Sequence, residues 1–184
     1  EGNLQRPDQL WDPAIVDIER VLGAGGYPAA HFCKEEVLGT LKILGLRTYA
    51  GVDVVYRAID DITSTSIGAD ASSRASALLQ FLELSAEGLR AEADATPGGL
   101  AKLCETIRTK AWMVPQSEPI HELVRWFIPI PPNGVMRPDQ LRPRTDAWLV
   151  AAEMRVPTVD VRSPVALELL GWNVPVPARV AARQ

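Results

Sequence analysis

The chain has few of the residues that carry redox or metal chemistry. Its 184 residues include two cysteines and two histidines. Cys33 and Cys104 lie far apart and form no Cys-x-x-Cys pair, so neither a redox motif nor a disulfide framework is predicted. No apolar run approaches the ~20 residues of a membrane helix, and the start lacks the basic-then-apolar order of a signal peptide. We therefore expect a protein of the reducing cytoplasm with no membrane partner.

Motifs for nucleotide binding and for hydrolysis are also missing. The glycine-rich run at 23–26 follows an expected helix and has no Lys-Ser/Thr after it, which indicates a helix-ending loop and not a phosphate cradle. No Gly-x-Ser-x-Gly elbow is present, and no triad can be chosen around His121 without selection after the fact. Asp60 and Asp61 are interpreted as part of a solvated helix face. We expect no catalytic residue and no cofactor.

A zinc site is disfavoured by the spacing of its candidate ligands. His31, Cys33, Cys104 and His121 have the right chemistry, but only His31 and Cys33 are close in sequence. Structural zinc usually takes its ligands in close pairs. Cys104 shares a helical face with Leu100, Leu103 and Ile107, which favours a small buried hydrophobe. No metal site is expected.

The charge balance argues against a nucleic-acid partner. The formal net charge is −4 and the isoelectric point is about 5.2, whereas proteins that neutralise phosphates are usually basic. Residues 1–134 carry −6 and residues 135–184 carry +2, and all positive charge in the second part is arginine. A helix–turn–helix interpretation of residues 37–62 meets the same objection, because Arg57 stands there against three aspartates.

What is present is a strong helical pattern. Hydrophobic residues make up 47% of the chain, enough for a sizeable core. Apolar residues at helical spacing predict short helices in the first two thirds of the chain and a closing helix over 164–170. The expected inward positions are Ile15, Ile18, Leu22, Val37, Leu38, Leu41, Leu44, Val52, Val55, Ile59, Ile62, Ala75, Leu78, Leu79, Leu82, Leu89, Leu100, Leu103, Ile107, Ala166, Leu169 and Leu170.

Capping residues set the expected ends of these helices. Asp12, Thr96 and Ser163 each precede a proline, which is the usual order at a helix start. Gly45 and Gly171 are each followed by an apolar residue, as at glycine-ended helices. Between 110 and 160 the chain is rich in Pro and Trp, which favours a small β element with ordered loops. The predicted class is therefore α+β, mainly helical.

The pentapeptide Arg-Pro-Asp-Gln-Leu occurs twice, at 6–10 and at 137–141. Each proline keeps the preceding residue extended, and each leucine supplies an apolar anchor. Asp8 and Asp139 are expected to bond to nearby backbone N–H groups. We interpret the pentapeptide as a recurring turn with a structural role, because a ligand site needs converging groups.

Four of the five tryptophans lie in the Pro-rich second half of the chain. Trp112, Trp126, Trp148 and Trp172 are expected in the core, since isolated aromatics in short strands mostly point inward, and the alternative for some of them is an exposed partner contact. A candidate partner-contact surface is formed by Trp126, Phe127, Ile128 and Pro129.

The order of several sequence blocks resembles sacsin and its plant, algal and protist relatives. The blocks run over residues 6–22, 27–32, 37–48, 103–115, 141–157 and 165–173, with Leu-Trp-Asp-Pro at the start and Leu-Gly-Trp at the end. In that family, each large repeat begins with a domain similar to the ATPase of the ninety-kilodalton heat-shock chaperone, and a long region follows it. The Asn-bearing helix and Asp-x-Gly-x-Gly stretch of such an ATPase do not occur here.

The resemblance implies a module of a giant co-chaperone, downstream of its ATPase-like domain. Its expected role is non-catalytic, spacing or coupling ATPase-like units and contacting flanking domains, heat-shock chaperones or client proteins. One alternative is a client- or peptide-binding domain that uses an exposed apolar patch. A second is an uncharacterised enzyme fragment, with His121, Glu118 or Glu122 meeting an arginine in a deep pocket.

The expected organisation is one module over residues 6–176. Residues 1–5 are expected to be a disordered or appended tail, and residues 177–184 the start of a further helix. Because the chain begins with Glu1 and not with Met, we interpret it as a fragment.

Overall fold

The computed structural model describes residues 5–15, 18–23, 26–64, 69–118, 128–150, 154–176 and 178. This part of the chain is mainly helical, as predicted. Its α-helices are α1 (Ile18–Leu22), α2 (Glu35–Ile43), α3 (Val52–Ser64), α4 (Ala69–Asp94), α5 (Gly99–Thr109), α6 (Ala147–Val150) and α7 (Pro164–Leu170).

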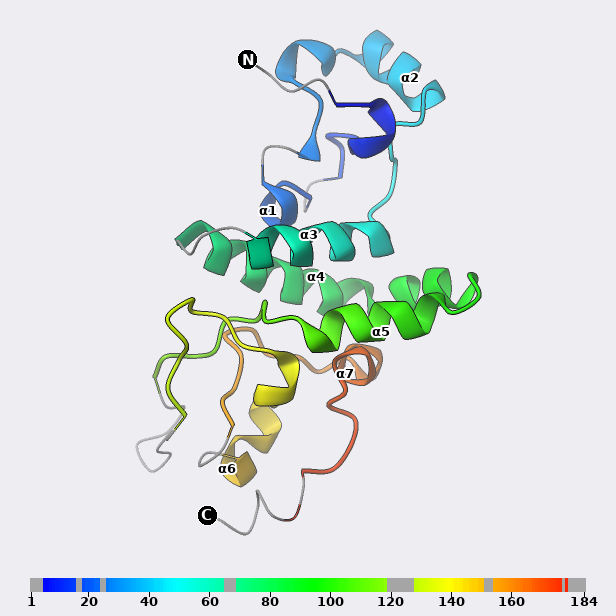
Figure 1. The fold of residues 1–184 in the computed structure, drawn as a ribbon. Helices are drawn as coiled ribbons and strands as arrows, with labels where there is room; N and C mark the ends of the chain where they lie inside the picture. The colour runs from blue at the N-terminus through cyan, green and yellow to red at the C-terminus, as the bar shows by residue number, and fades with distance from the viewer. Residues whose placement is uncertain are drawn as a thin grey trace.

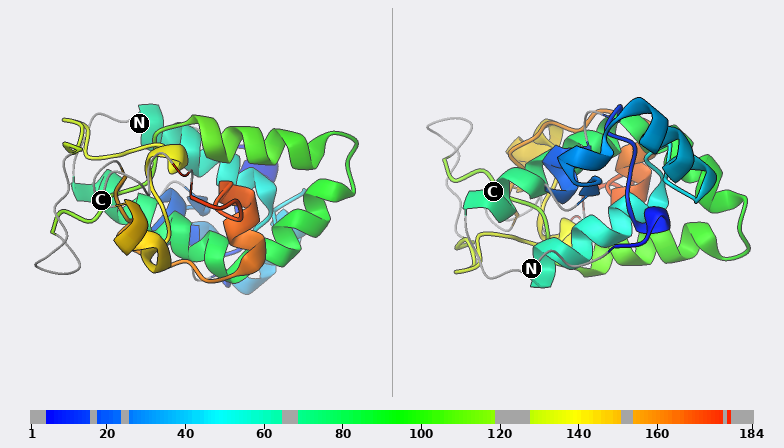
Figure 2. Two further views of the ribbon diagram at one scale, coloured as in Figure 1. Left: turned by 90° about the horizontal axis from the view of Figure 1, so that it is seen from below. Right: turned by 90° about the horizontal axis from the view of Figure 1, so that it is seen from above.

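The long helix α4 is the centre of the fold. It packs against α1, α3, α5 and α7, and Figure 2 shows α7 lying across α4 and α5. In Figure 1 the N-terminal segment and α2 lie at one end of the molecule, and α6 with the Pro-rich segment lies at the other. The helical layers between them hold the core.

The predicted apolar stripes of α3, α4 and α5 form this core. The buried members are Val55, Ile59, Ile62, Ala75, Leu78, Leu79, Leu82, Leu89, Leu103 and Ile107. Full burial of one such large side chain stabilises the fold by about 1.5–3 kcal/mol. Helical periodicity was a sound guide here because these helices have neighbours on the apolar side.

Two of the three expected helix starts are wrong. Asp12 does not begin a helix; its Oδ1 accepts a hydrogen bond from the Ala14 N–H at 3.0 Å and closes a turn, and α1 begins only at Ile18. Gly98, with φ of 75°, is the N-cap of α5 in place of Thr96. The prediction for Ser163 is confirmed, because its Oγ accepts from the Ala166 N–H at 3.3 Å.

Both predicted glycine-ended helices are confirmed. Gly45 and Gly171 have φ of 104° and 76°, a region that favours glycine. In each case the next residue closes the helix end: Leu46 N–H donates to the Leu41 carbonyl at 2.8 Å, and Trp172 N–H to the Leu167 carbonyl at 2.7 Å. Leu46 and Trp172 are buried.

Helix α2 differs from its prediction. It contains no buried residue, and Leu44, expected to point inward, is 61% exposed. The helix lies at one end of the molecule (Figure 1), where Val37, Leu38 and Leu41 are only half-buried. An apolar stripe predicts a helix, but burial also needs an element that covers the stripe.

The small β element expected between 110 and 160 is reduced to isolated bridges in the described residues. Met113 pairs with Met136, and Pro115 with Pro157. In this antiparallel pair the backbone N of each proline faces away from the partner segment, and because proline has no N–H, neither can donate to a further strand on its outer side. The neighbouring residues make the bonds instead, from Gln116 N–H to the Val156 carbonyl at 2.8 Å and from Thr158 N–H to that of Val114 at 3.0 Å.

The tryptophans divide between core and surface. Trp112 and Trp172 are buried as predicted, and their indole N–H groups donate to the carbonyls of Ile107 at 2.9 Å and Pro138 at 2.8 Å. Trp148 is 56% exposed, so its predicted core position is wrong. It lies on α6, a helix of four residues that is too short to present a continuous buried face.

The repeated pentapeptide folds twice into the same corner. Pro7–Gln9 and Pro138–Gln140 are each one turn of 3-10 helix, preceded by an arginine with ψ of 148° and 152° respectively. Each corner leads into a parallel bridge to an arginine backbone, Trp11 with Arg47 and Leu141 with Arg155. The two copies therefore share one backbone geometry, which agrees with the interpretation of the pentapeptide as a structural turn.

The capping group of this corner is glutamine and not aspartate. Oε1 of Gln9 accepts from the Arg6 N–H at 3.3 Å, and Oε1 of Gln140 from the Arg137 N–H at 3.0 Å. The two aspartates instead pair with the arginine side chains of their own corners, at 3.2 Å for Arg6–Asp8 and 2.9 Å for Arg137–Asp139. The expected bonds from Asp8 and Asp139 to backbone N–H groups are thus replaced by the glutamine bonds and by the Arg–Asp ion pairs.

Candidate functional site

Several arginine side chains of the described residues donate to backbone carbonyls of distant segments. Arg142, with a side chain only 4% exposed, donates to the Trp172 carbonyl at 3.2 Å and the Val174 carbonyl at 2.9 Å. Arg108 donates to the carbonyls of Leu169 at 2.9 Å and Glu168 at 2.6 Å, and so joins α5 to the end of α7. These cations stabilise connections between distant segments.

Arg155 makes a similar tie in the Pro-rich segment. Its guanidinium donates to the Ile128 carbonyl at 2.7 Å and the Gln116 carbonyl at 3.0 Å. Burial lowers the pKa of Arg155 from its ordinary value, because a desolvated cation is disfavoured. The group remains charged at neutral pH, since the ordinary pKa of arginine lies far above 7.

Two carboxylates of α4 accept hydrogen bonds from backbone N–H groups of distant segments. Glu83 of α4 accepts from the backbone N–H of Arg162 at 3.1 Å and of Ser163 at 2.9 Å, just before α7. Glu92 accepts from the Val52 N–H at 3.1 Å, at the start of α3. An acid at a helix N-terminus is stabilised by the free N–H groups and the helix dipole.

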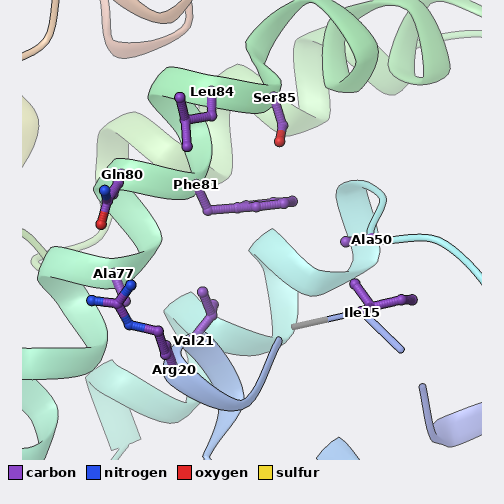
Figure 3. Close-up of a pocket in the computed structure, with 9 residues that line it drawn as sticks. All are labelled: Ile15, Arg20, Val21, Ala50, Ala77, Gln80, Phe81, Leu84 and Ser85. Atoms are coloured by element: carbon purple, nitrogen blue, oxygen red, sulfur yellow. The ribbon is translucent and has the colours of Figure 1, made fainter. Parts of the chain in front are cut away.

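An apolar pocket lies between α1 and α4 and is shown in Figure 3. Its volume is about 280 Å³. Phe81 extends from α4 into the space between the helices, with Ala50 and Ile15 on the opposite side. The nine described residues that line it are Ile15, Arg20, Val21, Ala50, Ala77, Gln80, Phe81, Leu84 and Ser85.

The pocket is open along α4. Leu84 is 75% exposed although it is a large aliphatic residue. Arg20 is the charged residue among those nine, and it makes no ion pair with any residue in the described part of the chain. The geometry suits an apolar group with a negative charge beside it.

A second, polar hollow of about 640 Å³ surrounds the edge of Trp11. The guanidinium groups of Arg47 and Arg57 lie 4.8 and 5.4 Å from the centre of the Trp11 ring, a cation–π arrangement. Three aspartates also line the hollow and each has a partner: Asp53 pairs with Arg47, Asp60 with Lys110 and Asp61 with Arg74. The charges already compensate one another, so nothing here selects a ligand ion.

The Trp11 indole N–H is buried and has no acceptor among the described residues. Because the nitrogen has no solvent access, a molecule in the hollow cannot reach it without moving the ring. Tyr56, on the wall of the same hollow, has a raised pKa because it is desolvated and lies near Glu92. These features belong to the packing of the N-terminal corner on α3.

The residues weighed above as metal ligands or reactive groups are not brought together in the described part of the chain. His31 is exposed, and Cys33 and Cys104 are half-buried free thiols on different elements. The Cys33 thiol donates to the Pro28 carbonyl at 3.5 Å. Asp60 and Asp61 carry the ion pairs given above, which the interpretation as a simply solvated face did not include.

Several predicted sites lie outside the described residues. These are Trp126 and Phe127 of the expected partner surface, and His121 and Glu122 of the enzyme alternative. Ile128 is half-buried and Pro129 is exposed, and the Ile128 carbonyl is held by Arg155. Glu118 is exposed.

The described residues show neither a metal-binding cluster nor a membrane-spanning helix. They contain no group of three or more His, Cys, Asp or Glu placed to hold a metal ion. Among the same residues, no helix combines the length and the apolar character that crossing a bilayer requires.

Comparison with known proteins returns no match to this chain, whether with protein-family models, with curated proteins or with solved structures.

Proposed function

We propose that this chain is a non-catalytic structural and interaction module, which spaces or couples neighbouring units and contacts partner proteins. The observation that carries the proposal is the use of its charged side chains. Backbone carbonyls accept hydrogen bonds from the guanidinium groups of Arg108, Arg142 and Arg155. Backbone N–H groups donate to the carboxylates of Glu83 and Glu92. A catalytic site instead needs ionisable groups that converge on open space.

These ties connect segments that are far apart in sequence. Arg142 reaches the chain after α7, Arg155 reaches the segments on both sides of residues 119–127, and Glu83 reaches the start of α7. A body tied across its irregular segments keeps a fixed shape, which a spacer or coupling unit requires. This supports a mechanical role more than a chemical one.

The sacsin-like order of sequence blocks supplies the proposed context. In a giant co-chaperone of that kind, a rigid module would transmit rearrangements between ATPase-like units in the cytoplasm. The partners would then be flanking domains of the same protein, heat-shock chaperones or client chains.

A nucleotide titration tests the absence of catalytic function. We expect that the 184-residue chain, titrated with a fluorescent ATP analogue and Mg²⁺, gives no saturable binding and releases no phosphate above the buffer rate. Saturable binding in the micromolar range, or turnover that a heat-denatured sample lacks, would overturn the proposal.

The pocket between α1 and α4 supports a second candidate function, peptide binding. It is apolar and open, and one of its lining residues is the exposed Leu84. A contiguous exposed apolar patch larger than monomers usually show marks an interaction site, and the apolar pocket together with the exposed Leu84 is the candidate for such a patch here. The peptide-binding site would then lie on α4 and not at Trp126–Pro129.

A further inference from the structure

We propose that the pocket between α1 and α4 receives an amphipathic helix of a partner protein, with an apolar anchor side chain in the pocket and an acidic residue beside Arg20. This inference rests on the proposed interaction role and names the partner class for it. The size of the pocket favours a side chain as its occupant, because about 280 Å³ is just below the 300–1,000 Å³ typical of small-molecule sites. One or two apolar side chains are a better match.

The outer face of α4 offers an apolar ridge on which a second helix can pack. Ala77, Phe81, Leu84, Gly88 and Ala91 follow one another at spacings of four, three, four and three residues, which places them on one ridge of the helix. Leu84, Gly88 and Ala91 are exposed. This ridge continues the pocket along α4 and carries no long polar side chain, so another helix can approach its backbone closely.

Two exposed charges beside the pocket and the ridge favour a helical partner with opposite charges near its two ends. Arg20 lies at the Ala77 end of the pocket (Figure 3) and is exposed. Glu87 is exposed on the turn after Leu84, toward the other end of the ridge. A partner helix with an acidic residue near Arg20 and a basic residue near Glu87 is complementary to both charges, and these charges set its direction. The negative charge of a lipid or of a small aromatic acid can pair with Arg20, but such a molecule leaves the ridge uncovered.

The test is a selection followed by titration. A display library of helical peptides with randomised surface positions is selected on the folded 184-residue chain and depleted on the Leu84→Glu variant. We expect enrichment of peptides with Leu, Phe or Trp at i and i+4 and with Asp or Glu at one end. Failure to enrich any peptide that distinguishes wild type from Leu84→Glu would overturn the inference.

Charge reversal then tests the direction of binding. For the enriched peptide, Arg20→Glu should weaken binding roughly tenfold or more, and a peptide with Lys in place of its acidic residue should recover affinity for that variant. Leu84→Glu should weaken binding to a similar degree. Ile43→Glu is the matched control, because Ile43 is also an exposed aliphatic residue, at 87%, but lies on α2 away from the pocket.

The outcomes separate this inference from the proposed function. Equal affinity of the peptide for wild type and Leu84→Glu, both shown to be folded by circular dichroism, refutes the pocket as the binding site. Saturable binding of a fatty acid to wild type but not to Leu84→Glu, with no peptide enriched, assigns the pocket to a small molecule and also refutes the inference. Neither result changes the nucleotide titration, which tests the absence of catalysis separately.

Discussion

Oδ2 of Asp12 lies 2.6 Å from Nζ of Lys42, and this ion pair joins a buried corner of the chain to α2. The Asp12 side chain is 9% exposed and that of Lys42 is 46% exposed. Helix α2 has no fully buried residue that would anchor it to the core. The ion pair therefore supplies a contact that holds α2 against the N-terminal corner. Its bond to Lys42, followed by the bond from the Ala14 N–H, lowers the pKa of Asp12 below its ordinary value of 3.8.

The first prediction concerns the pH dependence of stability. A carboxyl whose pKa is lowered on folding stabilises the fold above its unfolded pKa, and this contribution is lost as pH falls through the folded pKa. Asp12→Asn should therefore reduce the free energy of unfolding by about 1–2 kcal/mol at neutral pH, with the half-exposed Lys42 limiting the effect. Urea unfolding at a series of pH values measures the difference, which should shrink below pH 4 or so.

Asp94→Asn is the control for this experiment. Asp94 forms an exposed i,i+4 pair with Arg90 at 3.8 Å, and such pairs contribute little. If both variants lose the same free energy at every pH, the Asp12–Lys42 pair has no special role.

The second prediction concerns Arg142. Arg142→Met keeps much of the apolar stem but leaves the Trp172 carbonyl without its donor. A buried acceptor without a partner destabilises a protein by about 1–3 kcal/mol, so we expect a loss of about 2–3 kcal/mol in urea unfolding followed by Trp fluorescence. Arg162→Met, at a side chain 81% exposed, should change stability by less than about 0.5 kcal/mol. Equal effects would mean that the buried tie does not stabilise the fold.

The third prediction uses the repeated corner. Gln9→Ala and Gln140→Ala each remove an acceptor for the preceding arginine N–H, and should lower the free energy of unfolding by about 0.5–1 kcal/mol. Asp8→Ala and Asp139→Ala remove only exposed ion pairs and should have smaller effects. A larger loss from the aspartate variants in thermal or urea unfolding would restore the original assignment of Asp as the capping residue.

The helices that the sequence predicts well are those where local pattern and tertiary contacts agree. The stripe of Val55, Ile59 and Ile62 meets α4 and is buried. The stripe of α2 and the following Leu44 looks equally apolar, yet Leu44 is exposed, and none of the described elements covers it. Periodicity reports which face of a helix is apolar, but it carries no information on what lies opposite.

The ties and the pocket were harder to predict for a different reason. The acceptors of Arg108 and Arg142 are backbone carbonyls, which every residue has, so no sequence pattern marks them. The pocket combines α1, Ala50 and α4, and only the fold brings these together. One signal was available: α4 carries a second apolar ridge through Phe81 and Leu84 besides its core stripe, and a helix apolar on two sides needs two neighbours.

The last prediction contrasts two glycines of the α2 region. Gly45 has φ of 104°, and an added Cβ there would meet Asp8 at ordinary contact distances, 3.5 Å from its Cβ and 3.9 Å from its Cα. The expected loss for Gly45→Ala, about 1–2 kcal/mol, therefore comes from backbone strain and not from a clash. Gly39 is inside α2 and its Cβ would meet nothing within 4 Å, so Gly39→Ala should stabilise the protein by about 0.5–1 kcal/mol. Urea unfolding of both variants measures the opposite signs, and a loss at Gly39 would mean that the open side of α2 is covered in solution.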